Sequence, residues 1–266
     1  MSLGEGSSKM VGPLQRATAV LRALANGGRL GLSLTEIAKD LQLPHSTVHR
    51  ILAQMARERF VGQDEDSRKY ILGPLAFELG LAAERQFDIR GLCRPLLQRL
   101  AIEAEDTVYL VQRSGNEAVC IERQEGPSPI RVLTLEVGSR RPLGLGAGGL
   151  AILAALPHGE MEDVLGAIMP AIASRWRFPE GALRDSLQSA QENGHAVIRN
   201  RITLGTTAVG RHVKDSLGRP FAALSVAAVN SRMDVARIRQ IASLLEREAK
   251  EIERLLAGLR PTLSRQ

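Results

Sequence analysis

Apolar residues in the first 73 positions recur at helical spacing in three short segments. They predict helices at Leu14–Ala25, Leu34–Leu41 and His45–Arg59. Ser33 or Thr35 can cap the second helix, and Pro44 suits the first turn of the third, where its missing N–H costs nothing. The break between these two helices is short, so the pattern indicates two helices joined by a tight turn.

Two short runs of strand-forming residues follow, around a charged segment rich in turn formers. Phe60–Val61 and Arg68–Leu72 flank this turn at Gly62–Ser67, a pattern typical of a β-hairpin. After Gly73-Pro74, the segment Leu75–Phe87 carries an apolar stripe and is expected to form a rigid connecting helix. This helix and the first helix have more apolar positions than one small domain needs, which favours a two-fold dimer built through the first domain.

From Asp88 onward the pattern changes to longer helices and alternating strands. The predicted helices are Ile89–Glu105, Ala147–Ala155, Gly159–Ile172, Pro179–Asn193 and Val235–Ala257. The predicted strands are Thr107–Arg113, Ala118–Gln124, Ile130–Val137, His195–Asn200, Thr206–Val213 and Phe221–Val229. Antiparallel strands interrupted by a helical insert indicate a mixed α/β (α+β) domain.

Composition excludes several classes of protein. The chain of 266 residues is 44% hydrophobic and 24% charged, which excludes global disorder. The longest uncharged apolar run, Leu143–Leu156, is too short to span a bilayer, so no membrane partner is expected. Met1–Lys9 has no apolar stretch typical of a signal peptide. Cys93 and Cys120 show neither metal-binding nor redox spacing, so we expect reduced, buried thiols and a cytoplasmic location.

The net charge of +6 permits a polyanionic partner but is spread along the chain, so a DNA-binding function must be argued from a motif. Helix, tight turn, helix and hairpin together form a winged helix-turn-helix, whose second helix has the right size for the major groove of double-stranded DNA. Its outward positions are Ser46, Thr47, His49 and Arg50, with His45 on the same face as His49. Arg50 is suited to guanine or phosphate, and Arg68 and Lys69 lie where a wing meets the DNA backbone. The alternative is a winged helix used only for protein contacts.

This motif and later segments resemble the IclR-type bacterial transcriptional regulators. The resemblance is carried by Gln15-Arg16-Ala17, Leu34–Ala38, Leu43–Leu52, Tyr70–Pro74, Arg94–Leu97 and Gly138–Leu143. It implies a homodimer, often a dimer of dimers, on a pseudo-palindromic operator of a catabolic operon, and adds Gln15, Arg16 and Thr35 to the DNA-binding residues. It also implies a C-terminal domain of GAF/profilin-like architecture that binds a small organic effector.

The expected organisation has four parts. Residues 1–9 form a disordered arm or a tag remnant, and residues 10–73 form the winged helix-turn-helix domain. Residues 74–88 form the linker helix, and residues 89–260 form the effector-binding domain. No cofactor and no metal are expected.

A glycine-rich segment, Gly144–Gly149, formally matches the dinucleotide fingerprint G-x-G-x-x-G. That fingerprint needs a strand running directly into the loop, whereas Arg140-Arg141-Pro142 intervenes and helices follow, which disfavours a nucleotide-binding enzyme. Glycines also let a loop approach a ligand, and a helix starting near Ala147 offers backbone donors. The resemblance implies that Gly146 and Ala147 hold a carboxylate effector; the structural alternative is close packing alone.

The resemblance also places the effector pocket. Ile198 and Ala208 stand where a glyoxylate-sensing relative has an aspartate and a cysteine, and Ser225 matches a pocket serine. Ile130 and Leu133 are expected as apolar walls. We therefore expect a larger, more apolar effector such as an aromatic or alicyclic acid. The main alternative is a sensor domain that has lost its ligand and serves only assembly.

Catalysis is not expected from this sequence. The five histidines have no paired metal-ligand spacing, and no G-x-S-x-G nucleophile elbow occurs.

Overall fold

The computed structural model describes residues 12–84 and 89–258, so the expected N-terminal arm at residues 1–9 lies outside the described residues. The contacts divide the chain into two compact units, residues 1–87 and 88–266.

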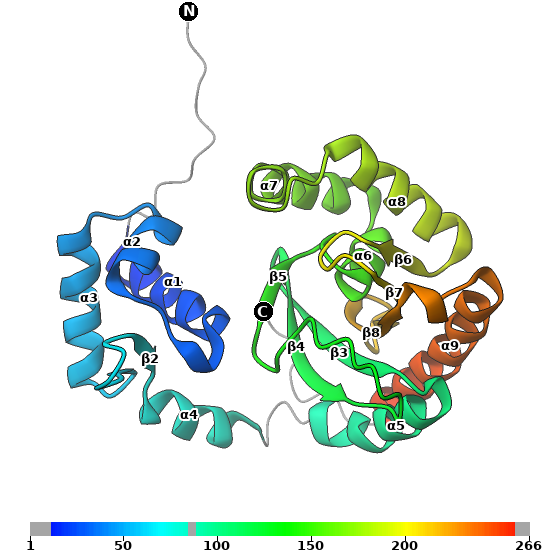
Figure 1. Cartoon of the computed structure of the whole chain (residues 1–266), viewed down its shortest axis with the longest axis horizontal. Helices are drawn as coiled ribbons and strands as arrows, with labels where there is room; N and C mark the ends of the chain where they lie inside the picture. The colour runs from blue at the N-terminus through cyan, green and yellow to red at the C-terminus, as the bar shows by residue number, and fades with distance from the viewer. Residues whose placement is uncertain (1–11, 85–88, 259–266) are drawn as a thin grey trace, which may run out of the picture. The chain divides into compact units, whose positions relative to one another are not determined.

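The first unit is a small helical domain with a two-stranded hairpin (Figure 1). Its elements are α1 (Pro13–Asn26), η1 (Gly28–Leu30), α2 (Leu34–Leu41), α3 (His45–Arg57), β1 (Val61–Gln63), β2 (Tyr70–Leu72) and α4 (Pro74–Glu84). Its buried core consists of Val20, Leu24, Ile37, Ala38, Val48, Leu52, Met55 and Val61. These are the inward positions of the three helices and of the first strand of the hairpin.

Local hydrogen bonds determine where α2 begins and ends. The hydroxyl of Ser33 accepts a hydrogen bond from the N–H of Glu36 at 3.3 Å, and the Glu36 carboxylate accepts one from the N–H of Ser33 at 2.7 Å. Of the two predicted caps, Ser33 is therefore the one used. Gln42 adopts a left-handed conformation with φ of 52° and ends the helix, and Pro44 then precedes the first turn of α3. This is the tight turn that the sequence predicts.

The second unit is built on one six-stranded antiparallel sheet with strand order β5-β4-β3-β8-β7-β6. The strands are β3 (Thr107–Ser114), β4 (Glu117–Gln124), β5 (Arg140–Pro142), β6 (Ala196–Arg199), β7 (Thr206–Lys214) and β8 (Pro220–Val229). The helices are α5 (Ile89–Ala104), α6 (Ala147–Ala154), α7 (His158–Trp176), α8 (Glu180–Asn193) and α9 (Val235–Gly258), with the short η2 (Asn230–Arg232) before α9.

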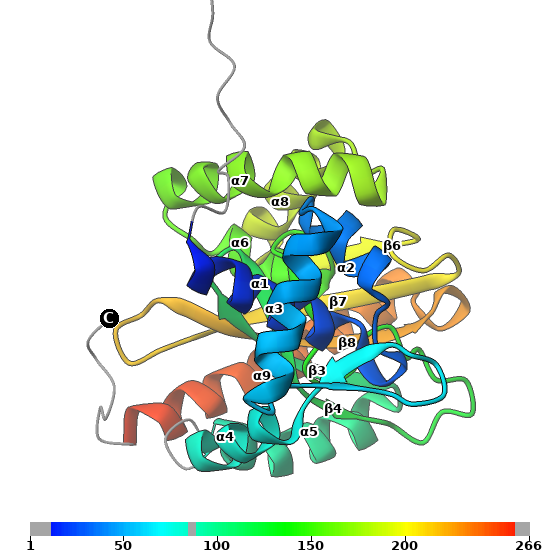
Figure 2. The same ribbon diagram turned by 90° about the vertical axis from the view of Figure 1, so that its left-hand side faces the viewer.

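Helices cover both faces of this sheet. Figure 2 shows α7 and α8 above the sheet and α5 and α9 below it. Strand alternation separates the two cores: Leu224 and Val226 contact the core of α5 and α9, whereas Ala223 and Ala227 contact the core of α6, α7 and α8. Ser225, between the two alanines, therefore faces the α6 side as predicted.

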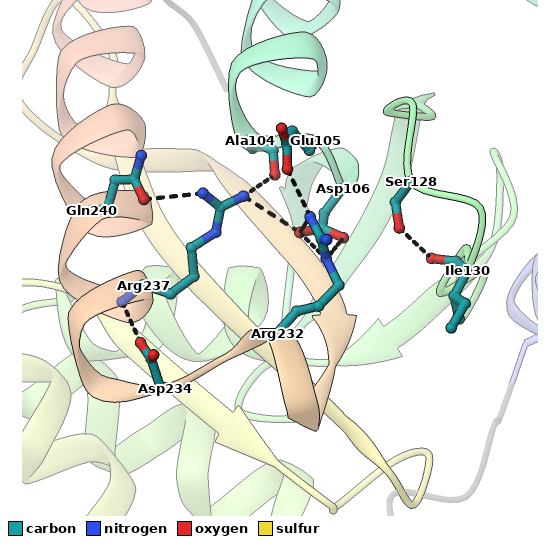
Figure 3. Close-up of polar contacts among 9 residues, drawn as sticks. All are labelled: Ala104, Glu105, Asp106, Ser128, Ile130, Arg232, Asp234, Arg237 and Gln240. Atoms are coloured by element: carbon teal, nitrogen blue, oxygen red, sulfur yellow. Dashed lines mark hydrogen bonds and ion pairs between the residues drawn. The ribbon is translucent and has the colours of Figure 1, made fainter.

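A cluster of polar side chains links the end of α5 and the start of β3 to η2 and α9 (Figure 3). The carboxylate of Asp106 is almost fully buried and pairs with Arg232 at 3.1 Å and Arg237 at 3.7 Å. Arg237 also donates to the backbone carbonyl of Ala104. The buried charge is thus compensated by two arginines, which link the start of β3 to η2 and α9.

The predicted strand Ile130–Val137 is wrong, because these residues form an irregular segment. Its backbone bonds to a side chain: the Tyr109 hydroxyl donates to the carbonyl of Val132 at 2.6 Å and accepts from the N–H of Thr134 at 3.0 Å. The place beside β4 is taken by β5, which the sequence analysis did not predict. Further backbone carbonyls of the segment accept hydrogen bonds from side chains: that of Thr134 from Arg141 and that of Leu135 from Arg123.

Candidate nucleic-acid interface and ligand cavity

The α3 helix presents a polar and basic face to solvent. His45, Ser46, His49 and Arg50 are exposed and Thr47 is half-buried. Val48 and Leu52 lie on the opposite face and are fully buried. The N-terminus of α3 follows Pro44 and carries no side-chain cap, so the N–H groups of His45 and Ser46 remain available to an anion such as a DNA phosphate. The geometry is that of a recognition helix held by its apolar face.

The other predicted DNA-binding residues of the helices lie on α1 and α2. The side-chain oxygen of Gln15 accepts a hydrogen bond from the N–H of Gly12 at 3.2 Å, which caps α1. Arg16 is half-buried on the same helix, and Thr35 is exposed in the first turn of α2. Gln15 therefore has a capping role in addition to any contact with DNA.

The hairpin turn presents both predicted basic residues, with Arg68 exposed and Lys69 half-buried. Arg68 has a positive φ of 57°, and Asp64 fixes the turn by accepting hydrogen bonds from the N–H and hydroxyl of Ser67 at 2.8 and 2.7 Å. The same two hydrogen bonds, that from the side chain first, lower the pKa of the Asp64 carboxyl. The carboxylate thus serves to shape the wing.

The second unit contains a cavity between α6 and the sheet, with a volume of about 50 Å³. Every strand of the sheet contributes to the wall. The strand residues are Tyr109, Val111, Ala118, Arg141, Ile198, Thr206, Ala208, Ser225 and Ala227. The loop and helix residues are Val132, Thr134, Leu135, Leu145, Gly146, Ala147, Gly148, Gly149, Arg201 and Ile202.

Glycines allow the N-terminus of α6 to approach the sheet. A Cβ on Gly210 of β7 would lie 2.3 Å from the carbonyl oxygen of Ala147, and one on Gly148 would lie 2.8 Å from a methyl carbon of Val111. Gly146 precedes the helix with a φ of 96°, a conformation that favours glycine. Close packing therefore explains why positions 148 and 210 are glycines. Gly146 and Ala147 line the cavity. The dinucleotide alternative fails, because the loop follows an edge strand of an antiparallel sheet.

Five of the seven predicted pocket residues line this cavity. They are Gly146, Ala147, Ile198, Ala208 and Ser225. Ile130 and Leu133 do not: their side chains are 57% and 50% exposed, and Figure 3 shows Ile130 beside Ser128 in the irregular segment. Because Tyr109 fixes the backbone there, Val132 turns inward in their place. This part of the predicted wall is wrong.

Five polar residues of the cavity wall were not predicted from the sequence: Tyr109, Thr134, Arg141, Arg201 and Thr206. Burial raises the pKa of the Tyr109 hydroxyl and lowers the pKa of the Arg141 guanidinium, since each charged form loses solvation. The double arginine before the glycine loop was the available indication. Within residues 12–84 and 89–258, no group of side chains is suited to hold a metal ion, and no helix is long and apolar enough to cross a membrane.

A winged helix-turn-helix with a basic recognition face, joined in one chain to an α+β unit that encloses a cavity, defines a one-component DNA-binding regulator. Family models match both units: the IclR helix-turn-helix domain over residues 13–65 and the bacterial transcriptional regulator IclR C-terminal domain over residues 82–254. The chain belongs to the IclR family.

Individual relatives agree with this assignment. The chain is 30% identical to the HTH-type transcriptional repressor AllR of Klebsiella pneumoniae over 254 residues, covering 93% of this chain and 90% of the relative. It is 28% identical to the regulator KipR of Bacillus subtilis, covering 84% and 89% of the two chains. This protein is therefore a DNA-binding transcriptional regulator and not an enzyme.

Solved structures show the same fold. An IclR regulator from Alicyclobacillus acidocaldarius superposes with a TM-score of 0.73 at 26% identity, covering 92% of this chain and 98% of that one. An IclR homologue from Microbacterium hydrocarbonoxydans, crystallised in complex with 4-hydroxybenzoate, gives a TM-score of 0.69 at 24% identity and covers 93% and 100% of the two chains.

Proposed function

We propose that this regulator binds a pseudo-palindromic operator of a catabolic operon as a homodimer, and that an organic acid bound in the cavity controls its affinity for DNA. Its place of action would be the cytoplasm, where bacterial genomic DNA lies. The observation that carries the DNA-binding part is the exposed polar face of α3 opposite a fully buried apolar face.

Arg50 is proposed to read a base, because its position in the second turn of α3 and its exposure suit the major groove. Arg50→Ala should weaken binding to the operator by about 1–3 kcal/mol and relax specificity at one base pair. The operator is the duplex that the protein selects from fragmented genomic DNA, and binding is measured by fluorescence anisotropy. Arg254→Ala removes the same charge from α9 and is the control. If the Arg50 variant and the wild type bind the operator with equal affinity, the proposed placement of α3 in the major groove is wrong.

The wing is proposed to contact phosphates through Arg68 and Lys69. Replacing either by alanine should weaken binding to all sequences alike and reduce the slope of log affinity against log salt by about one. The acidic residues Glu65 and Asp66 at the tip are exposed and would repel the backbone, so the contact is confined to the base of the turn. An unchanged slope would exclude the wing from the interface.

Dimerisation is proposed through the apolar surface of the first unit. Leu14 on α1 and Phe77, Leu79 and Leu81 on α4 are large apolar residues that are 49–76% exposed. A two-fold dimer would place two copies of α3 one helical turn apart on DNA, about 34 Å. Sedimentation at micromolar concentration should show a dimer or a dimer of dimers. A monomer would contradict the proposal.

Effector binding is proposed for the cavity, whose wall combines apolar side chains with the backbone donors of Gly146 and Ala147 and the hydroxyl of Ser225. The 4-hydroxybenzoate complex of the Microbacterium homologue supports an aromatic acid of similar size. Ala147→Leu should abolish the response to such an acid and spare DNA binding. If the variant responds with wild-type affinity, the ligand binds elsewhere. If no acid shifts the melting temperature of the wild type, the domain serves assembly only.

A further inference from the structure

Arg141 occupies an unusual position for an arginine. It lies on the short edge strand β5, opposite Ala118 of β4, and its side chain lines the cavity. Its guanidinium donates to the backbone carbonyl of Thr134 in the irregular segment. The neighbouring Arg140 does not line the cavity; it pairs with Glu117 and Ser114, each at 2.9 Å.

The charge inside the cavity is positive and uncompensated. Of the described residues that line it, two are arginines and none is an aspartate or glutamate. Arg201, the second arginine, stacks over the ring of Phe178 at 4.8 Å from its centre. Arg141 is half-buried and Arg201 is exposed, and the other half-buried arginines of this unit pair with carboxylates, such as Arg113 with Glu160 at 2.7 Å. Within the described chain, Arg141 has only the carbonyl of Thr134 as a partner.

A half-buried guanidinium without a counter-charge is costly, because it loses part of its hydration and a single carbonyl oxygen cannot replace the lost water molecules. The cost disappears when an anion enters. A planar guanidinium offers paired N–H groups that match both oxygens of a carboxylate. The apolar side chains that line the cavity, including Val111, Leu145 and Ile198, suit the hydrocarbon part of such an anion.

We propose that Arg141 is the anion anchor of the cavity and holds the carboxylate of a monocarboxylic acid whose ring or chain contacts the apolar wall. This inference rests on the proposed function, because it specifies the ligand class of the same cavity. Arg141 supplies the full charge, and the backbone donors of Gly146 and Ala147 serve a second polar group of the ligand. Arg201 adds positive potential at the wall without direct pairing.

The competing explanation is that Arg141 only fixes the irregular segment through Thr134. The two explanations predict opposite signs for the stability of the ligand-free protein. If the guanidinium waits for an anion, Arg141→Met removes an uncompensated charge and should raise the melting temperature of the second unit. If its role is structural, the same change should lower that temperature. Arg140→Met, which breaks a satisfied ion pair on the same strand, should lower it in either case.

The test measures binding of matched acids and neutral amides to the full chain by calorimetry and thermal shift. The pairs are benzoate and benzamide, 4-hydroxybenzoate and 4-hydroxybenzamide, and cyclohexanecarboxylate and its amide. We expect the wild type to bind at least one acid and to bind its amide far more weakly. Arg141→Met should weaken acid binding by roughly 10- to 150-fold, the range for a hydrogen bond to a charged group. Arg140→Met should leave acid binding unchanged.

Each contrary result has a distinct meaning. If acids bind equally well to the wild type and to Arg141→Met, the cavity is a sensor but Arg141 is not its anchor. If amides bind as well as acids, the ligand class is wrong while the sensor function stands. If no compound binds and Arg141→Met does not raise the melting temperature, the anchor and the sensor function are both overturned.

Discussion

Replacing Gly210 by alanine tests how closely α6 must approach the sheet to form the cavity. The new Cβ would lie 2.3 Å from the carbonyl oxygen of Ala147 and 2.8 Å from the N–H nitrogen of Gly148, where ordinary contact begins at 3.4 Å. Both atoms belong to the backbone, so the overlap of about 1 Å cannot be relieved by rotating a side chain. Either the first turn of α6 or the strand β7 must move.

The expected cost lies at the upper end of the range for overpacking, about 3 kcal/mol. For a unit of this size, each kcal/mol lowers the melting temperature by about 2–4 °C, so the second unit should melt about 6–12 °C earlier. Because the movement displaces the donors of Gly146 and Ala147, binding of the organic acid should also weaken, including in protein that remains folded.

The assay is differential scanning calorimetry of the full chain, with Gly166→Ala as the matched control. Gly166 lies within α7 and has no atom within 4 Å of an added Cβ, so alanine should stabilise that helix by about 0.5–1 kcal/mol. The two substitutions add the same methyl group and should shift the melting temperature in opposite directions. A Gly210 variant that melts at or above the wild-type temperature would refute the close approach of α6 to β7.

Three further predictions concern stability and reactivity. Leu52→Ala should destabilise the first unit by about 2–5 kcal/mol and abolish DNA binding, while calorimetry with the acid ligand shows an intact second unit. Burial raises the pKa of Glu122, but the hydrogen bonds, led by that from Arg90, outweigh burial and leave the pKa below its usual value. The ionised carboxylate therefore stabilises the folded state at neutral pH, and this contribution is lost as the pH falls through the lowered pKa. Glu122→Gln should therefore cost about 1.5–3 kcal/mol at pH 7 and progressively less in urea titrations at lower pH, and a cost that does not change with pH would contradict the ion pair. Burial raises the pKa of Cys93 and Cys120 to about 12, so neither thiol should react with a disulfide reagent at about pH 8 before unfolding.

The helices could be predicted from the sequence because their apolar spacing matches the burial that the fold requires. In α3, the same spacing separates Val48 and Leu52 from the exposed residues that are proposed to meet DNA. Five of the six strands predicted for the second unit are present, as β3, β4, β6, β7 and β8, and the error lies at the edge of the sheet beside β4. The alternation around Ile130 resembles a strand, but strand formation depends on a free edge of the sheet, and β5 occupies that edge.

The residues of the cavity wall could also be predicted only in part from the sequence. Ser225 and Gly146 were placed through the resemblance to the family, and the alternation along β8 agrees with the face on which Ser225 lies. Arg141 could not be placed, because nothing in the local pattern shows which face of a three-residue edge strand turns inward. The Tyr109 hydroxyl, which brings Val132 into the wall, acts across 23 residues and leaves no periodic trace.

The most direct test of the account is the affinity of the full chain for its selected operator duplex, measured by anisotropy with and without the acid that binds the cavity. If the cavity controls DNA binding, saturating acid should change the dissociation constant by about 5- to 150-fold, the usual range for coupling between two sites. The matched amide should have no effect. An unchanged dissociation constant under conditions where calorimetry shows the acid to be bound would contradict the account.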